Sequence, residues 1–123
     1  MLLSTLQKIK KVLDSKFSLD ETLKKDILNF FKRYKKGSYI YAGILKRKFQ
    51  LSSKEVYELL EELENEKILK SYYELYCNKC SKTNGELYET FNQIPKTFIC
   101  ENCEEELIGI ENAVILYKVI IDD

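Results

Sequence analysis

The four cysteines of this chain have the spacing best suited to chemistry. They form two Cys-x-x-Cys pairs, Cys77 with Cys80 and Cys100 with Cys103, separated by nineteen residues. Two residues between paired cysteines allow a tight turn to direct both sulfurs at one ion, and two such turns complete a tetrahedral set of ligands. The spacing therefore predicts one four-thiolate metal site formed by all four cysteines.

The metal expected at this site is one structural zinc ion. The chain contains no histidine, so a catalytic zinc with imidazole ligands and an open water position is not expected. A closed four-sulfur site would instead contribute free energy of folding. Iron in a rubredoxin-like site is the alternative metal. Disulfide bonds are the other possible use of the cysteines, and we expect metal instead because the chain shows no secretory signal.

Each cysteine pair is followed by a residue with a side chain, Ser81 in the first case and Glu104 in the second. Metal-binding turns often carry a glycine at this position, because the backbone there is left-handed and a Cβ atom disfavours that conformation. The two residues therefore predict a slightly unusual turn geometry.

The composition argues against catalysis and against a membrane protein. The chain has no histidine and no glycine-rich phosphate loop, and its thiols are assigned to metal, so no nucleophile and base can be recognised. We therefore expect no enzymatic activity. Even the apolar run of residues 113–121 is interrupted by Lys118, and no run reaches membrane-spanning length. We expect a cytoplasmic protein that has no membrane partner.

The net charge of zero conceals a strong asymmetry along the chain. Residues 1–50 contain thirteen lysines and arginines against four acidic residues, a net charge of +9, and residues 51–123 have a net charge of −9. This asymmetry indicates separate binding faces. The length of 123 residues is enough for one compact domain with a small appended module.

Helix signals recur through the first half of the chain. Ser52 and Glu55 form a capping box, which predicts a helix from Ser53 to about Asn65. A second capping box is expected over residues 18–21, where it opens a helix that Gly37 ends. Earlier in the chain, Ser4 with Gln7 predicts a first helix through Leu13.

Shorter elements are expected between and after these helices. Residues 38–40 are predicted to be extended, and residues 41–49 to form a brief helix with Ile44 and Leu45 facing inward. Residues 68–76 alternate as a strand does, so one side of that strand is expected to face the core and the other an interface.

Residues 42–60, AGILKRKFQLSSKEVYELL, combine a small helix, a polar turn, a serine cap and a second helix. This pattern resembles a winged helix-turn-helix, and the likeness covers about residues 18–76. With the cysteine module that follows, the chain resembles winged-helix and zinc-ribbon proteins such as the large subunit of general transcription factor E and small bacterial regulators or adaptors. The resemblance implies an α+β fold with an N-terminal helix and a winged helix-turn-helix at 1–76, a four-cysteine zinc ribbon at 77–110, and a C-terminal β-strand at 111–123 that packs on the ribbon or the winged helix. It also implies a non-enzymatic part that binds nucleic acid or protein in a larger assembly.

The helix at the recognition position favours a protein partner. Residues 53–67 contain two lysines and six glutamates, a net charge of −4, and phosphates oppose the insertion of such a helix into a DNA groove. We therefore expect an adaptor or regulatory subunit. The candidate contacts to a protein partner are Tyr57, Glu58, Glu61, Glu62, Tyr72, Tyr76, Val114 and Leu116.

A DNA-binding transcription regulator is the alternative function. The basic first half could contact phosphates without reading the base sequence. The candidate nucleic-acid contacts are Lys32, Arg33, Lys35, Lys36, Lys46, Arg47 and Lys48.

Residues 113–121 form a strong β segment that is apolar on both faces except at Lys118. Such a strand is expected to be covered on both sides within the chain, by the ribbon and the helical domain. The alternative is pairing with a strand of another protein or of a second copy, which would give a homodimer.

Overall fold

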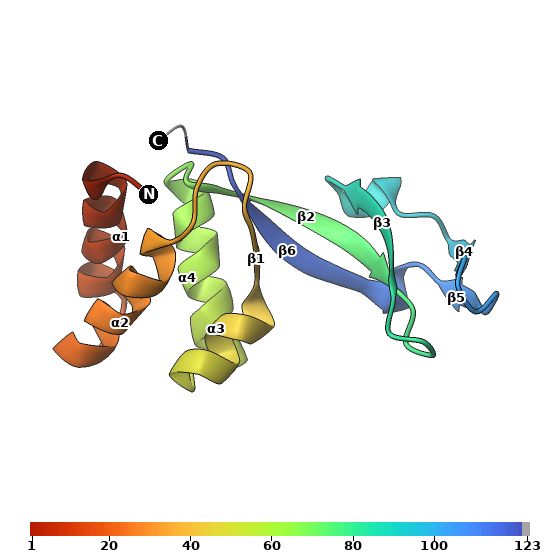
Figure 1. The fold of residues 1–123 in the computed structure, drawn as a ribbon, viewed down its shortest axis with the longest axis horizontal. Coiled ribbons are helices and arrows are strands. Elements are labelled where there is room, and N and C mark those ends of the chain that lie inside the picture. Colours follow the sequence, from red (N-terminus) through yellow and green to blue (C-terminus); the bar gives the residue numbers. More distant parts are fainter. Residues whose placement is uncertain (122–123) are drawn as a thin grey trace. The chain divides into compact units, whose positions relative to one another are not determined.

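The computed structural model describes residues 1–121, and within them the chain is a mixed α+β protein (Figure 1). The helices are α1 (Leu3–Lys16), α2 (Glu21–Lys32), α3 (Ala42–Phe49) and α4 (Ser53–Asn65), with short 3-10 helices η1 (Phe91–Gln93) and η2 (Ile110–Asn112). The strands are β1 (Tyr39–Tyr41), β2 (Leu69–Tyr76), β3 (Thr83–Tyr88), β4 (Thr97–Ile99), β5 (Glu106–Ile108) and β6 (Ala113–Val119). The α+β class expected from the sequence is confirmed.

The contacts divide the described chain into two compact units. Residues 1–70 and 117–121 form one, here called the helical unit, and residues 71–116 form the other, called the cysteine unit. One sheet has the strand order β1-β6-β2-β3, and β4 pairs with β5 in a second sheet. The division passes through β2 and β6, whereas the sequence placed boundaries after residues 76 and 110.

Apolar side chains from the helices form the core of the helical unit. α1 and α2 pack against each other, and α4 packs against α1 and α3. Full burial of each large apolar side chain contributes about 1.5–3 kcal/mol. The completely buried side chains of these helices include Ile9, Leu13, Ile27, Phe31, Leu45, Leu60 and Leu63.

The capping box at the start of α4 is confirmed. The Glu55 backbone N–H donates to the Ser52 hydroxyl (3.1 Å), and the Ser52 N–H donates to the Glu55 carboxylate (3.0 Å). The helix spans Ser53–Asn65, as the sequence predicted. Because all of its signals lie within a few residues, local chemistry was sufficient to place this helix.

The cap of α2 differs from the sequence prediction. The carboxylate of Asp20 accepts the Leu23 N–H (2.7 Å), so Asp20 caps the helix and Ser18 lies outside it. Aspartate caps a helix as well as serine does. The helix also ends earlier than predicted, at Lys32, although the ring of Tyr34 still packs on Phe30 with its centroid 5.0 Å away.

Two predictions for the other helices are wrong. α1 begins at Leu3 without a side-chain cap and continues to Lys16, so Ser4 lies within it. In α3, Leu45 is completely buried but Ile44 is 37% exposed. Consecutive residues of a helix point about 100° apart, and the side that contains Leu45 and Phe49 faces the core.

The turn between α3 and α4 contains a left-handed residue. Gln50 has a φ of 54° and ends α3, and Leu51 and Ser52 lead into α4. Gln50 carries a Cβ atom that disfavours this conformation. The turn therefore keeps its shape at a local energetic cost.

The C-terminal strand β6 lies inside its sheet. Its neighbours are β1 and β2, so its backbone pairs within the chain on both sides. At the β1 side, the Gly37 N–H donates to the Val119 carbonyl (2.9 Å) and the Val119 N–H donates to the Ser38 carbonyl (2.8 Å). Both edges of β6 are therefore paired with strands of the same chain, whereas the sequence also allowed pairing with a second copy.

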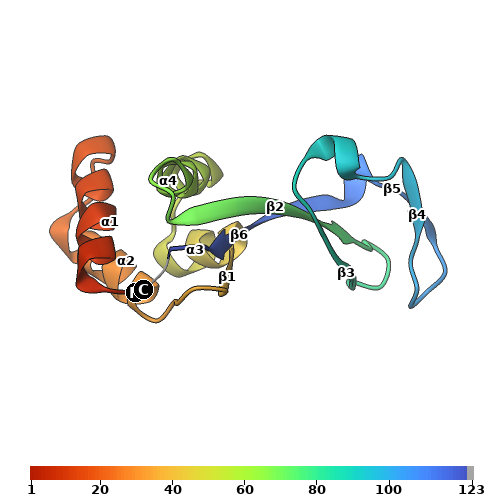
Figure 2. The same cartoon turned by 90° about the horizontal axis from the view of Figure 1, so that it is seen from above.

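Strands β3, β4 and β5 lie wholly within the cysteine unit. β2 pairs antiparallel with β3, with Tyr73 opposite Tyr88 and an irregularity between Glu74 and Tyr76. The Tyr73 ring packs on Phe91, with ring centroids 4.3 Å apart. β4 and β5 lie side by side in both views (Figure 1, Figure 2).

Candidate metal centre

The two Cys-x-x-Cys segments fold into matching turns. In the first, the Ser81 N–H donates to the Cys77 carbonyl (2.8 Å), and the Cys77 N–H donates to the Lys82 carbonyl (2.8 Å). The second turn repeats both bonds, from the Glu104 N–H to the Cys100 carbonyl (2.8 Å) and from the Cys100 N–H to the backbone carbonyl of residue 105 (2.9 Å). Equivalent hydrogen bonds present the two cysteine pairs in the same way.

The residue after each pair takes the left-handed conformation that glycine would favour. Ser81 has a φ of 63° and Glu104 a φ of 62°. The two turns therefore share the same hydrogen bonds and the same left-handed residue, although neither has a glycine there. The energetic cost of a left-handed residue with a Cβ atom is retained in both turns.

The four sulfurs meet at one point with spacing suited to a metal ion. All four lie within 4.8 Å of one another. The sulfurs of Cys77 and Cys103 are 3.5 Å apart, and those of Cys80 and Cys100 are also 3.5 Å apart. Zinc bound to four sulfurs at about 2.3 Å holds them about 3.8 Å apart. The sulfur arrangement thus fits a tetrahedral ion of this size, and all four predicted ligands are brought together.

The same distances exclude disulfide bonds. Bonded sulfurs are about 2.05 Å apart, and all four cysteines are free thiols. Cys77 and Cys100 are buried, whereas Cys80 is half-buried and Cys103 is exposed. One side of the sulfur cluster therefore faces solvent.

Strands β4 and β5 support the buried side of the cluster. Phe98 lies opposite Leu107 in their antiparallel register. Both side chains pack with Cys77 and Cys100, and Leu107 is buried. The small core of the cysteine unit is therefore built around its thiols.

Backbone dipoles favour the thiolate form of Cys100. The N–H of Cys103, and after it that of Asn102, lowers the pKa of the Cys100 thiol to about 7. At Cys103 the N–H of Glu105 lowers the pKa, but partial desolvation of the sulfur and the neighbouring sulfurs outweigh it and raise the pKa to about 12. Four thiols this close repel one another when ionised, and a bound cation would remove that repulsion.

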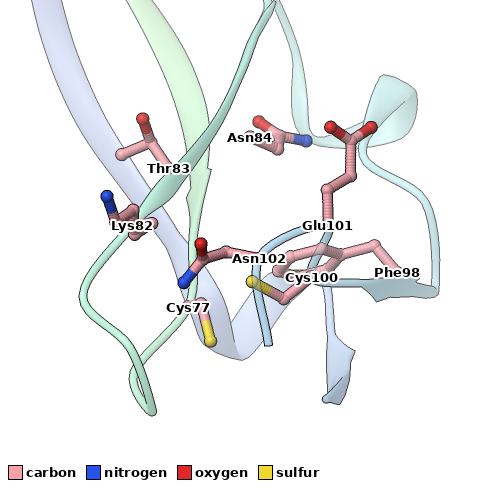
Figure 3. Close-up of a pocket in the computed structure, with 8 residues that line it drawn as sticks. All are labelled: Cys77, Lys82, Thr83, Asn84, Phe98, Cys100, Glu101 and Asn102. Carbon is pink, nitrogen blue, oxygen red and sulfur yellow. The ribbon is translucent and has the colours of Figure 1, made fainter. Parts of the chain in front are cut away.

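A pocket of about 270 Å³ lies beside the sulfurs (Figure 3). Residues from the start of β3 form one side, and residues from β4 and the second turn form the other. The lining residues are Cys77, Lys82, Thr83, Asn84, Phe98, Cys100, Glu101 and Asn102. Together with the exposed Cys103, this pocket gives a chelator access to the centre.

The basic residues predicted to contact nucleic acid lie at the end of α2, in the segment between α2 and β1, and in α3. All seven are exposed, at the end of α2, in the segment that leads to β1 and in the last turns of α3. Arg33 and Lys48 line the same pocket, so the two helix ends are brought together. Lys46 donates to the Ser53 hydroxyl (2.8 Å), and the Lys48 ammonium lies 5.4 Å from the centre of the Phe30 ring.

The residues predicted to contact a protein partner differ in exposure. Tyr57, Glu58 and Glu61 are exposed on α4, and Tyr57 is 42% exposed. Four others are only half-buried, namely Glu62, Tyr72, Tyr76 and Val114. Leu116 is buried in the core and offers no surface to a partner.

Sequence reasoning missed a set of exposed isoleucines in the cysteine unit. Ile99, Ile108 and Ile110 are 65%, 51% and 65% exposed. A signal was present, because β4 and β5 each place two apolar residues in succession, and successive strand residues face opposite sides. One residue of each pair must therefore face outward.

None of the helices in residues 1–121 is both long and apolar enough to cross a membrane. Comparisons of this chain with protein-family models, with curated proteins and with solved structures gave no match. Its function is therefore inferred from its own residues.

Proposed function

We propose that this chain is a non-enzymatic adaptor or regulatory subunit, in which a winged-helix unit carries a zinc ribbon that binds a protein partner. The observation that carries the proposal is the group of exposed isoleucines Ile99, Ile108 and Ile110, which lies in an acidic segment of the cysteine unit.

The order of elements in the helical unit supports a winged helix. Residues 50–52 join α3 to α4, which is a turn length found in helix-turn-helix motifs. β2 and β6 are neighbours in one sheet, and the short strand β1 adjoins β6. In a winged helix, two strands follow the second helix of the helix-turn-helix, here α4, and a short strand that precedes the first helix, here α3, joins their sheet. Residues 77–112 then stand in the chain where the tip of the wing would be.

The four thiols support one structural Zn²⁺ rather than a catalytic one. Cys77, Cys80, Cys100 and Cys103 would fill all four positions of a tetrahedral ion. No position would remain for water or substrate, so the bound ion would hold the cysteine unit in shape. Iron suits the same four sulfurs and is distinguished by elemental analysis.

Ile99 and Ile108 lie on the face of the β4–β5 sheet that is directed away from the sulfurs. Thr97 lies opposite Ile108, and Ile99 lies opposite Glu106 in the register of β4 and β5. Ile99 and Ile108 are therefore diagonal neighbours on the face opposite Phe98 and Leu107. Exposed apolar patches of this kind mark interaction surfaces.

The surroundings of this face indicate which partner it suits. Residues 97–117 contain five glutamates and no lysine or arginine. The glutamates are Glu101, Glu104, Glu105, Glu106 and Glu111. Nucleic acid is repelled by such a surface, and a protein with an apolar centre and a basic rim complements it. The exposed Glu58 and Glu61 of α4 likewise favour a basic protein partner over nucleic acid.

Paired variants test the proposal. Ile99→Gln with Ile108→Gln removes the apolar face, and Ile44→Gln is the control because Ile44 is an exposed isoleucine of the helical unit. Cross-linking in native extract should attach one partner protein, through the partner's basic residues, to the wild type and to the control. The same cross-link should be absent for the double variant. Identical cross-links from all three proteins would contradict the proposal, provided that each retains its metal.

A DNA-binding transcription regulator is the second candidate function. The observation that favours it is the shared pocket of Arg33 and Lys48, which brings the basic ends of α2 and α3 together. Fluorescence anisotropy with mixed-sequence duplex DNA tests it across a range of salt concentrations. A steep loss of affinity as salt rises supports phosphate contacts, and no binding at low salt leaves the adaptor function alone.

A further inference from the structure

Helices α1 and α2 form a groove on the surface of the helical unit. Its volume is about 360 Å³, and most of its lining surface is apolar. α1 contributes Leu3, Leu6, Gln7 and Lys10, and α2 contributes Lys25, Leu28, Asn29 and Lys32. The winged-helix and zinc-ribbon proposal uses none of the four α1 residues.

The lining residues have the same spacing on both helices. Each helix contributes positions i, i+3, i+4 and i+7, starting from Leu3 in α1 and from Lys25 in α2. Residues at this spacing form one stripe along a helix. A stripe of this length extends about 10 Å, so the groove can receive about two turns of a third helix.

The groove has an apolar floor. Leu6 is buried at its base, Leu28 is half-buried, and Leu3 is 71% exposed although it lies in a helix. An exposed leucine beside two partly covered ones provides apolar area that a partner can bury. Phosphate groups would gain nothing from these three side chains.

The rim of the groove is basic. Lys10, Lys25 and Lys32 line it, and no carboxylate among residues 1–121 contributes to the lining. Lys10 is bound to Asp14 (2.9 Å), so its charge is partly compensated. Within residues 1–121 the ammonium groups of Lys25 and Lys32 form no ion pair. Two uncompensated positive charges therefore flank the apolar floor.

We propose that this groove binds an amphipathic helix of a partner protein, with apolar residues at i, i+3 or i+4, and i+7, and with acidic residues beside them. The concave shape fits a helix, the leucines fit its apolar stripe, and the lysines fit its carboxylates. This site is separate from the isoleucine face, so either can fail while the other stands. An adaptor with both surfaces would join an acidic partner to a basic one.

The test uses the metal-loaded full chain labelled with nitrogen-15. The probe is a synthetic peptide of about fourteen residues, long enough for the two turns of the groove, with leucines at helical spacing and glutamates between them. A second peptide of the same composition has its residues permuted. We expect the first peptide to shift the amide resonances of groove residues in α1 and α2, and to bind at least about tenfold more tightly than the permuted one.

Two pairs of variants locate the binding. Leu3→Gln removes an exposed leucine of the floor and should weaken the peptide about fivefold or more, whereas Leu2→Gln changes an exposed leucine outside the groove and should have little effect. Lys25→Glu should weaken it by a similar factor, and Lys8→Glu, an equal charge change elsewhere on α1, should not. The side chains of Leu3, Lys25 and Lys8 are exposed, so these variants keep the fold.

Three results would overturn the proposal. The first is the absence of groove shifts at millimolar peptide, and the second is equal binding of the permuted peptide. The third is tighter binding at the same resonances by anionic lipid vesicles or by mixed-sequence duplex DNA, which would assign the groove to a membrane surface or to nucleic acid.

Discussion

Removal of the metal should unfold the cysteine unit and leave the helical unit folded. Within residues 77–112 the buried apolar side chains are Cys77, Ile94, Cys100 and Leu107, and two of these belong to the candidate metal centre. Burial of Ile94 and Leu107 contributes about 3–6 kcal/mol together. The apparent binding free energy of a structural zinc is about 10–16 kcal/mol. A bound zinc ion would therefore be the larger stabilising contribution in this segment.

The perturbation is Cys77→Ser with Cys80→Ser, which removes two of the four ligands. The matched control is Asn78→Ser with Lys79→Ser, which changes the exposed residues between them and keeps all thiols. Elemental analysis should find one zinc per chain in the wild type and the control and none in the ligand variant. Hydrogen exchange should then become fast in β3, β4 and β5 of the ligand variant, while the core amides of α1, α2 and α4 stay protected.

Two results would refute this reasoning. One is a wild-type chain that contains neither zinc nor iron in stoichiometric amount and still protects the amides of the cysteine unit. The other is a ligand variant whose amides exchange as slowly as those of the control, since four sulfurs within 4.8 Å would then need no ion to hold them.

Three further predictions concern the helical unit. Asp20→Ala should lower the free energy of unfolding by about 1 kcal/mol because it removes the cap of α2. Ser18→Ala, the control, should change the free energy of unfolding by less than about 0.5 kcal/mol. Urea denaturation of both variants measures the difference. Gln50→Gly should raise the free energy of unfolding by about 0.5–1 kcal/mol, because glycine tolerates the left-handed φ of 54°, and the same urea measurement checks the sign. The backbone N–H of Ser52, followed by its hydroxyl, holds the pKa of Glu55 below its ordinary value of 4.5. The stability that this bond contributes is therefore complete above pH 4.5 and is lost as the pH falls through the lowered pKa, which carboxyl titration by NMR together with acid denaturation of Glu55→Gln can test.

A sequence prediction was more accurate where the residues that carry its signal are close together in the chain. The bounds of α4 were predicted correctly because Ser52 and Glu55 are three residues apart and bond to each other. At α2 two residues could each cap a helix, and the structure uses Asp20. Ile44 was placed inward because it is apolar, but the core side of α3 passes through Leu45. Hydrophobicity alone does not separate adjacent positions on a short helix.

The candidate site divides in the same way. The grouping of the four cysteines was predicted from their spacing, because two residues between cysteines suffice to form the turn that aims both sulfurs. The isoleucine face was not predicted, because it depends on the register of β4 with β5. The groove was also missed, because Leu3 and Leu28 come from helices whose packing brings distant residues together.

The sequence by itself determined which four cysteines come together, the capped start of α4, the α+β class and the opposite charges of the two halves of the chain. These properties depend on composition or on residues within a turn of one another, where bond geometry leaves few alternatives. Only the tertiary structure decided that β6 lies between β1 and β2, that Leu116 is buried, and which apolar side chains stay exposed. Those outcomes depend on contacts between segments distant in the chain, and they are selected by the burial of all the segments together.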